Sequence, residues 1–273
     1  MRKTVVCVLT GAALAVSMIG STACFAEEQK TFTVGFDAEY PPYGYMDENG
    51  EYTGFDLELA QAVCDLEGWE LVKTPIVWDS KDMALNSGSI DCIWNGFTMN
   101  GREEDYTWSK PYVDNSQVIV VPESSDVTDL SGLAGKIVGV QAAPAALELL
   151  SEGGDQADLA ATFGSLQQFP DYNNAFVELQ AGSIDAVAMD IGVAQYQLKQ
   201  KEGYKILDEK LNSEKYAIGF KLGNEELRDT VDDAMDQLVA DGTFAKLAEK
   251  YELTDMVCLG TDEGETETET EGV

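Results

Sequence analysis

Two charged residues of opposite sign each end a segment of the same kind in this chain. The segment Leu85–Arg102 reads LNSGSIDCIWNGFTMNGR, and its first half is nearly repeated in LQAGSIDAVAMD, which ends at Asp190. A guanidinium binds a carboxylate through two parallel N–H groups, and a carboxylate can receive an ammonium group. A cation and an anion at matching strand ends would therefore suit a zwitterion held between two similar halves.

The elements that must position these two residues also repeat. The alternation in Thr31–Asp37 predicts a strand, and Lys136–Val140 restarts the same order of strand, loop and helix, with Gly35 and Gly139 at corresponding positions. Helices placed between strands in each half imply two α/β lobes. Apolar spacing further predicts strands at 70–77, 117–121 and 217–220, helices at 55–66, 227–238 and 244–251 and from 145 onward, and a hairpin at 47–54.

Composition excludes several classes of function. The chain has 273 residues, of which 44% are hydrophobic, so it is long enough for two modest lobes. Its net charge of -33 argues against nucleic acid and anionic lipid as partners. It contains no histidine, which excludes serine-type triads and histidine metal sites. We expect no metal and no cofactor.

Residues 1–26 predict a secretory signal peptide. Two basic residues precede an apolar run at 5–19, which is too short to span a bilayer, and small residues follow. Cleavage after Ala26 would release a free protein, whereas cleavage after Ala23 would leave Cys24 as the first residue, ready for lipid attachment. Either route predicts secretion across the cytoplasmic membrane, to the periplasm or the cell surface.

Three cysteines lie beyond the signal peptide, at positions 64, 92 and 258. An odd, scattered set is not a disulfide framework, so we expect buried free thiols. A bridge that involves Cys258 is the alternative.

Five motifs in a fixed order carry a family resemblance. They are VGFDAEYPPY with GFDLELAQAV, WDSKDMALNSGSIDCIWNGFTMNGRE, DLSGLAGKIVGVQ, LQAGSIDAVAMD and VADGTFAKLAEKY. Together they resemble the extracellular solute-binding proteins of family 3, the polar amino-acid receptors of bacterial ABC importers, from about Thr31 to Leu253. The resemblance implies an α/β, two-lobed periplasmic-binding-protein fold, in which each lobe is a mixed sheet flanked by helices. A two-strand hinge would let the lobes close on a ligand.

The resemblance also implies where the lobes divide. The first lobe would be discontinuous, made of residues 29–113 and 217–258, and the second lobe would comprise residues 114–216. The chain would cross between them near Tyr112 and near Ala217. Residues 259–273 are acidic and almost without large apolar side chains, so we expect a disordered tail.

The ligand-binding positions that the resemblance implies are Asp37, Tyr40, Trp78, Asn95, Gly96, Thr98, Arg102, Ala143, Ala145 and Asp190. Arg102 would take the ligand α-carboxylate, assisted by the backbone of Gly96 and the hydroxyl of Thr98. Asp190 would receive the ligand ammonium. The spacing in TMNGR is one residue shorter than the family's commonest form.

Further positions would contact the ligand side chain or its carboxylate. Tyr40 and Trp78 match two apolar walls, and Asp37 matches a position that meets a distal amino group in receptors for basic amino acids. At the start of the second-lobe helix the family's Gly and hydroxyl residue are replaced by Ala143 and Pro144, so backbone N–H groups from Ala145 would have to serve.

Simpler roles exist for the same residues. Arg102 could pair with Glu103 or Glu104 at the surface. Asp190 could cap a helix, Tyr40 and Trp78 could be core aromatics, and Asp37 could cap a loop.

The predicted function is the substrate-binding protein of an amino-acid ABC transporter, not an enzyme. It would close on a free amino acid, with polar or basic side chains favoured. It would then deliver the ligand to a membrane permease and its ATPase. We expect a monomer that meets the membrane only through a lipid anchor, if at all. The alternatives are a ligand-sensing domain of a signalling receptor and a carboxylate-using periplasmic enzyme on the same fold.

Overall fold

The computed structural model describes residues 29–142 and 145–260. The predicted signal peptide with Cys24, the position Ala143 and most of the predicted acidic tail lie outside these ranges.

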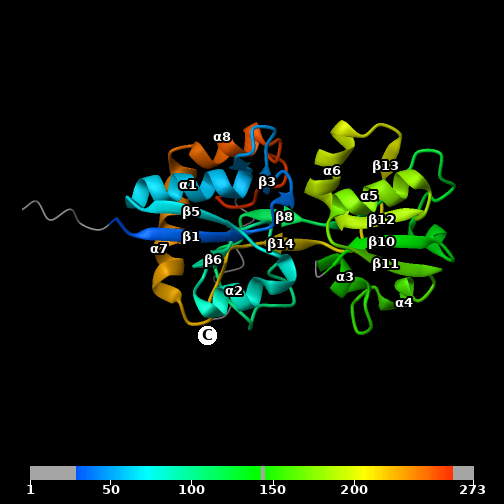
Figure 1. Ribbon diagram of the computed structural model, residues 1–273, viewed down its shortest axis with the longest axis horizontal. Coiled ribbons are helices and arrows are strands. Elements are labelled where there is room, and N and C mark those ends of the chain that lie inside the picture. The colour runs from blue at the N-terminus through cyan, green and yellow to red at the C-terminus, as the bar shows by residue number, and fades with distance from the viewer. Residues whose placement is uncertain (1–28, 143–144, 261–273) are drawn as a thin grey trace, which may run out of the picture.

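Two five-stranded sheets form the cores of the two lobes, side by side along the long axis of the molecule (Figure 1). The sheet of the first lobe has the order β5-β1-β6-β15-β7, in which β1 pairs parallel with β5 and β6, and β15 pairs antiparallel with β6 and β7. Its strands are β1 (Thr31–Phe36), β5 (Glu70–Pro75), β6 (Cys92–Ile93), β7 (Thr107–Trp108) and β15 (Gly219–Phe220).

The sheet of the second lobe has the order β11-β10-β12-β9-β13. Its first three strands are parallel, and β9 pairs antiparallel with β12 and β13. The strands are β9 (Gln117–Pro122), β10 (Ile137–Gln141), β11 (Ser165–Phe169), β12 (Ala186–Asp190) and β13 (Tyr204–Ile206). Both sheets are mixed, so the predicted α/β architecture is confirmed.

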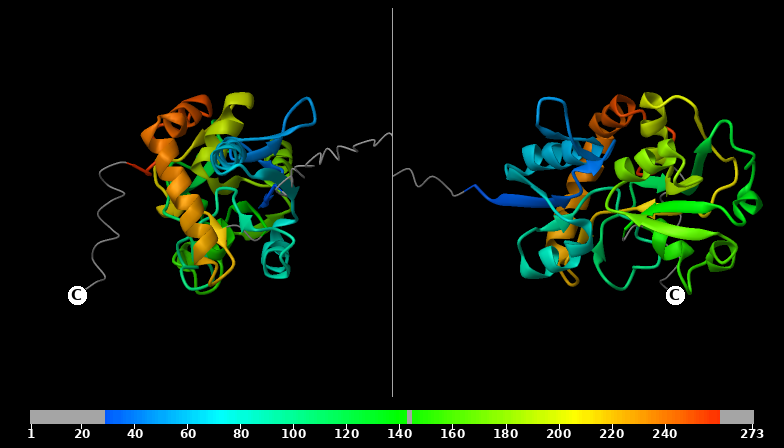
Figure 2. Two further views of the ribbon diagram at one scale, coloured as in Figure 1. Left: turned by 90° about the vertical axis from the view of Figure 1, so that its left-hand side faces the viewer. Right: turned by 45° about the vertical axis from the view of Figure 1, so that its right-hand side comes forward.

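Helices cover both sheets, and the C-terminal helices return to the first lobe, where Figure 2 shows them beside the N-terminal segment. Phe55 and Phe244, far apart in sequence, pack there at 5.9 Å between ring centroids. The first lobe carries α1 (Phe55–Glu67), α2 (Lys81–Ser87), α7 (Glu225–Ala240) and α8 (Thr243–Lys250). The second carries α3 (Ala145–Leu150), α4 (Ala157–Ala160), α5 (Tyr172–Ala181) and α6 (Ile191–Gln200). A small sheet of β2 (Glu39–Tyr40), β3 (Gly44–Met46) and β4 (Tyr52–Thr53) includes the hairpin around residues 47–51.

Two extended segments connect the lobes, β8 (Val113–Asn115) and β14 (Glu214–Tyr216). They pair antiparallel and run through the middle of the molecule in Figure 1. Two paired crossings allow the lobes to rotate about them as a hinge. The residue limits given above for the lobes stay predictions.

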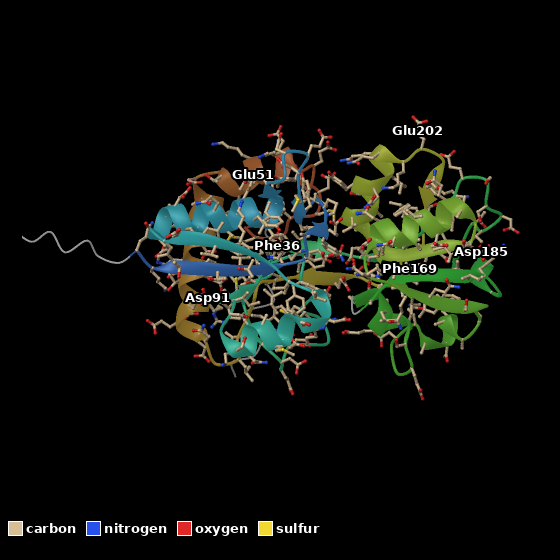
Figure 3. The ribbon with its side chains drawn as sticks, in the orientation of Figure 1. Phe36, Glu51, Asp91, Phe169, Asp185 and Glu202 are labelled. Carbon is tan, nitrogen blue, oxygen red and sulfur yellow. The ribbon has the colours of Figure 1, made fainter. Side chains whose placement is uncertain are left out.

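The internal repeat extends to individual hydrogen bonds. In the first lobe Asp91 accepts the N–H of Thr33 at 2.7 Å, and in the second Asp185 accepts the N–H of Ile137, also at 2.7 Å. In return, the backbone N–H of Asp91 donates to the carbonyl of Thr33, and that of Asp185 donates to the carbonyl of Ile137. Figure 3 shows Asp91 in one lobe and Asp185 in the other. Each aspartate thus links the strand that it precedes, β6 or β12, to the neighbouring strand β1 or β10.

The two corresponding glycines explain why the repeat includes an isoleucine. A Cβ at Gly35 would lie 2.4 Å from Ile90, and one at Gly139 would lie 2.6 Å from Ile184. Contacts this short do not occur, so each isoleucine of the GSID segments fills the space that its glycine leaves. The GSID repeat therefore has a structural role in packing each lobe.

Cys64, Cys92 and Cys258 are buried and form no disulfide with one another, as predicted. In residues 29–142 and 145–260 no helix is long and apolar enough to cross a membrane.

Candidate functional site

A cavity between the lobes brings together every expected ligand residue that the structure describes. It is small, with about 20 Å³ open to the centre of a water molecule, which is room for one or two waters. The lobes are therefore closed on each other, and they must part to admit a ligand. The cavity is lined by Asp37, Tyr40, Trp78, Asn95, Gly96, Phe97, Thr98, Arg102, Gln141, Ala145 and Asp190.

Other polar contacts between the lobes hold this closed arrangement. The amide of Asn173 on α5 donates to Glu39 on β2 at 3.0 Å, and Lys199 on α6 pairs with Glu252 beyond α8. These groups are exposed, so each contact contributes little by itself.

The short segment before Arg102 forms a tight turn. The N–H of Arg102 donates to the carbonyl of Met99 at 3.0 Å, and Gly101 has φ of +80°. A glycine with positive φ at the third position of a four-residue turn is typical of type II geometry. The shortened TMNGR spacing is thus accommodated by this turn, which directs Arg102 into the cavity.

The Arg102 guanidinium is almost fully buried, with 8% of the residue exposed. One terminal nitrogen donates to the carbonyl of Thr98 at 2.9 Å, and the other pairs with Glu148 of α3 at 2.6 Å. This ion pair crosses the cleft, so the surface pairing with Glu103 or Glu104 is not what the structure shows. A guanidinium has five N–H groups, so donors remain for a ligand carboxylate.

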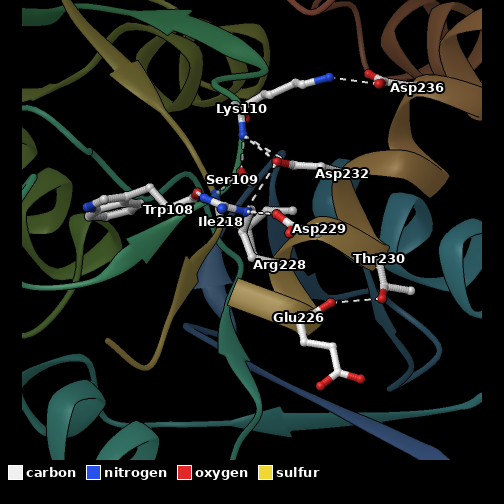
Figure 4. A network of polar contacts seen from close by, with 10 residues as sticks. All are labelled: Trp108, Ser109, Lys110, Ile218, Glu226, Arg228, Asp229, Thr230, Asp232 and Asp236. Carbon is white, nitrogen blue, oxygen red and sulfur yellow. Dashed lines mark hydrogen bonds and ion pairs between the residues drawn. The ribbon is translucent and has the colours of Figure 1, made fainter. Parts of the chain in front are cut away.

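A polar network continues from the Arg102 turn, and Figure 4 shows the part of it around Trp108, Lys110 and Arg228. The indole of Trp108 donates to the carbonyl of Arg102 at 3.0 Å, and Arg228 on α7 donates to the carbonyl of Trp108 at 2.9 Å. Asp232, one turn along α7, accepts the N–H of Lys110 at 3.1 Å. Helix α7 therefore fixes the strand that holds the turn in place.

Two donors expected for the ligand carboxylate have other partners in this structure, and their roles toward a ligand stay predictions. The N–H of Gly96 donates to Asp56 at 2.6 Å, and the hydroxyl of Thr98 donates to Glu214 at 3.0 Å. Both acceptors are buried carboxylates, and such groups require donors. Gly96 and Thr98 line the cavity, but these hydrogen atoms do not face it.

Asp56 is fully buried beneath the cavity at the start of α1. Its Oδ2 accepts from Gly96 and from the hydroxyl of Tyr112 at 2.9 Å, whereas its Oδ1 has no partner. Burial raises the pKa of Asp56 to about 7. Gly96 itself has φ of +56°, and a Cβ there would lie 2.9 Å from Tyr216, so only glycine fits.

Asp190, at the end of β12, is 2% exposed and accepts four hydrogen bonds. The amides of Asn115 and Gln117 donate to its Oδ1 at 2.8 and 2.6 Å. The hydroxyls of Tyr216 and Tyr172 donate at 2.5 and 3.1 Å. Its side chain makes no capping hydrogen bond to the helix that follows, so the helix-cap alternative is not observed. All these donors are neutral, and they leave the charge available to a cation in the cavity.

Two aromatic side chains line the cavity as expected. Tyr40 is 7% exposed and packs 6.1 Å from Tyr172 between ring centroids. Trp78 meets Phe97 edge to face at 5.5 Å. Offset and edge contacts of this kind hold rings in place and leave their outer surfaces for a ligand. Their stacking role stays a prediction.

A second polar cluster occupies another part of the cavity wall. Gln141 Nε2 donates to Asp37 Oδ2 at 2.9 Å, and the other oxygen of Asp37 accepts the N–H of Glu39. The free Oε1 of Gln141 and both amide atoms of Asn95 are buried without partners. Burial raises the pKa of Asp37. These groups offer mainly acceptors, which favours a ligand side chain that donates hydrogen bonds.

Several residues of the site were missed from the sequence. Gln141 was within reach, because it stands two residues after Gly139 as Asp37 stands two residues after Gly35. The others come from distant segments and gave no local signal: Asn115, Gln117, Glu148, Tyr172, Glu214 and Tyr216.

No metal site accompanies the cavity: across the part of the chain that the structure describes, no three Cys, Asp or Glu side chains could hold an ion together. Ala145 lines the cavity at the start of α3, and the preceding Ala143 is outside the described residues.

Comparisons with known proteins identify the family of the chain and its fold. The family model for bacterial extracellular solute-binding proteins, family 3, matches residues 32–254. The L-cystine-binding protein TcyJ of Escherichia coli is 28% identical over 229 residues, which cover 82% of this chain and 84% of that protein. Other relatives from Escherichia coli are an arginine-binding and a histidine-binding protein.

Two of the many solved structures that share the fold show how similar the chains are. One is a substrate-binding protein of an ABC uptake transporter from Streptococcus pneumoniae with bound histidine, with TM-score 0.77 and 30% identity, covering 81% of this chain and 92% of that one. The other is the ancestral amino acid-binding protein AncCDT-1, described as a precursor of cyclohexadienyl dehydratase, with TM-score 0.74 and 29% identity, covering 81% and 95%. The chain belongs to the bacterial extracellular solute-binding proteins, family 3.

Proposed function

We propose that this protein captures a free amino acid in the cleft, with Arg102 binding the α-carboxylate and Asp190 the α-ammonium. One observation supports this most: a buried guanidinium of the first lobe and a buried carboxylate of the second line a single cavity. A ligand that carries both charges would satisfy both only when the lobes are closed. Hydrogen bonds to charged groups contribute about 1.5–3 kcal/mol each, so binding of both the α-carboxylate and the α-ammonium favours the closed arrangement of the lobes.

The ligand side chain is polar or basic in this proposal. Asp37, Gln141 and Asn95 present acceptors that a guanidinium, ammonium, imidazole or amide could fill. A zwitterion alone would pair with Arg102 and Asp190 and would leave the partly buried Asp37 without a cation. The named ligands of the relatives, cystine and histidine, also have polar side chains.

The partners in this proposal are a membrane permease and its ATPase, which would receive the amino acid from the open form. The protein acts outside the cytoplasmic membrane as a monomer. Attachment through Cys24 would keep it at the membrane surface if cleavage occurs at that residue.

A thermal-shift screen over the twenty amino acids, ornithine and cystine tests the proposal. A ligand that binds the folded state raises Tm in a concentration-dependent way. We expect the largest shift with a polar or basic amino acid. A protein that none of them stabilises would contradict the proposed function.

The neighbour described as a dehydratase precursor makes a carboxylate-using enzyme the second candidate. Incubation with arogenate and with prephenate tests it. Product formation that is lost in Asp190→Asn would favour the enzyme, and absence of product together with amino-acid binding would favour the receptor.

A further inference from the structure

A second buried carboxylate lies directly behind Asp190, at the hinge. Glu214 belongs to β14 and is 4% exposed. Its Oε1 accepts from Asn115 and Gln117 at 2.7 Å each and from Thr98 at 3.0 Å. The residue therefore contacts the first-lobe ligand wall, and the two amides connect it to the ammonium site in the second lobe.

The side-chain amides of Asn115 and Gln117 each bridge the two carboxylates. The NH₂ group of Asn115 donates to both Asp190 and Glu214, and the NH₂ group of Gln117 does the same. A carboxylate only accepts, so these contacts fix which end of each amide faces the pair. As a result the oxygens of both amides are buried without partners. This arrangement leaves two acceptors unsatisfied, a cost that the fold bears in order to hold the pair together.

The donors to this pair are neutral amides and hydroxyls. Two buried carboxylates held this close repel each other, and one of them tends to keep a proton. Burial, and then the charge of Asp190, raises the pKa of Glu214. The titratable groups that face Glu214 are Asp190 on β12, Tyr172 on α5, Tyr216 on β14 and Tyr43, with Asp114, Lys210, Lys215 and Asp255 around a hinge groove. The Lys215 ammonium lies 3.9 Å from Asp114.

Glu214 also has a separate connection to the exterior. Asp190 lines the ligand cavity, whereas Glu214 lines the hinge groove together with Asn115. Its Oε2 accepts from Asn212 at 3.0 Å, and the second lone pair of that oxygen can carry a proton. A proton on Glu214 can thus exchange through the groove while a ligand fills the cavity.

We propose that Glu214 is a positioning residue that holds a proton when the ammonium site is empty and releases it when a ligand ammonium reaches Asp190. The O–H bond of the Glu214 carboxylic acid breaks, the proton passes to water in the groove, and the ligand ammonium keeps its own protons. The new positive charge then balances the pair, and both amides remain oriented toward Asp190. Amino-acid binding is therefore coupled to the release of one proton at the hinge. This inference rests on the proposed function.

Isothermal titration calorimetry in buffers with different ionisation enthalpies measures the coupling. The probes are L-arginine and L-glutamine at about pH 6, because neither side chain titrates there. L-Glutamine brings no side-chain cation to Asp37, so the proton that the protein releases on binding L-glutamine reports on the ammonium site. We expect about one proton released per ligand in the wild type, with Kd falling up to about tenfold per pH unit as pH rises toward neutrality.

Matched variants assign the proton to its residue. Glu214→Gln keeps the shape and removes the titration, so proton release should fall to near zero and the pH dependence of Kd should flatten. Glu214→Asp should retain the release. Glu202→Gln makes the same change at an exposed position of the second lobe and should behave as the wild type (Figure 3).

Three results would overturn the inference. They are ligand binding without proton release in the wild type, unchanged release in Glu214→Gln, and lost release in Glu202→Gln. If Glu214→Gln does not fold, proton release in the wild type and its retention in Glu214→Asp still test the inference. A protein that binds no amino acid in the thermal screen would overturn the proposed function and this coupling with it. Binding without Glu214-dependent release would overturn the coupling alone.

Discussion

Gln141 Nε2 lies 2.9 Å from Asp37 Oδ2, and the two residues occupy corresponding positions in the two halves of the chain. Each follows a glycine of a corresponding strand by two positions, Gly35 of β1 in the first lobe and Gly139 of β10 in the second. The internal repeat thus supplies both partners of a hydrogen bond across the cleft. This bond crosses the closed cleft, and in the proposed function the end of the ligand side chain would meet it.

Gln141→Leu removes the second-lobe partner of Asp37. A hydrogen bond to a charged group contributes about 1.5–3 kcal/mol, so affinity for a ligand with a donating side chain should fall at least about tenfold. Calorimetric titration with L-arginine measures it. Gln180→Leu, on an exposed face of α5, is the control and should bind as the wild type. An unchanged Kd for Gln141→Leu would show that this amide does not contribute to ligand binding.

Glu148→Gln frees one terminal nitrogen of Arg102 from a competing carboxylate. Glu148 has 58% of its side chain exposed, so the ion pair contributes no more than about 1 kcal/mol. The variant should bind amino acids up to about fivefold more tightly, because the ligand carboxylate need not share Arg102. Glu152→Gln, exposed just beyond α3, makes the same charge change away from the cleft and controls for it. Weaker binding by Glu148→Gln alone would mean that Glu148 assists the ligand.

Asp56→Asn should change how stability depends on pH. The pKa of Asp56 rises from 3.8 in the unfolded chain to about 7 in the fold, so the folded state favours the neutral acid. Below about pH 4 the carboxyl is protonated in both states, so its burial does not depend on ionisation. The free energy of unfolding then falls as pH rises from about 4 through about 7, by roughly 4 kcal/mol in total. Urea unfolding from pH 4 to 8 would measure this fall.

Asp56→Asn stays neutral throughout and should lose most of that fall. Asp65→Asn, at an exposed position of the same helix, removes one charge from the acidic surface and should keep it. Equal slopes in the Asp56→Asn and wild-type proteins would refute the assignment.

Much of the fold was accessible from the sequence because its signals are local. The glycines of β1 and β10, the GSID repeats and the apolar helices each depend on neighbouring residues, and the structure confirms the architecture that they predict. The cavity was also accessible in outline, since Arg102 and Asp190 end segments that the repeat relates.

What the sequence did not reveal depends on residues brought together by the tertiary structure. Gly96 and Thr98 were expected to donate to the ligand, but their hydrogens are taken by Asp56 and Glu214, which lie 40 and 116 positions away. The partners of Asp190 likewise come from three separate strands and a helix. No local pattern identifies such contacts, because burial decides which carboxylate needs which donor.

Thermal-shift titration of Arg102→Ala and Arg102→Lys with the amino acid that most stabilises the wild type tests the central claim most directly. Loss of a bidentate, desolvated contact should abolish the ligand-induced rise in Tm in Arg102→Ala. It should reduce the rise strongly in Arg102→Lys, because an ammonium cannot bind both carboxylate oxygens in the same way. Each variant must retain its own cooperative unfolding transition. A folded Arg102→Ala protein that the amino acid stabilises as much as the wild type would contradict the account.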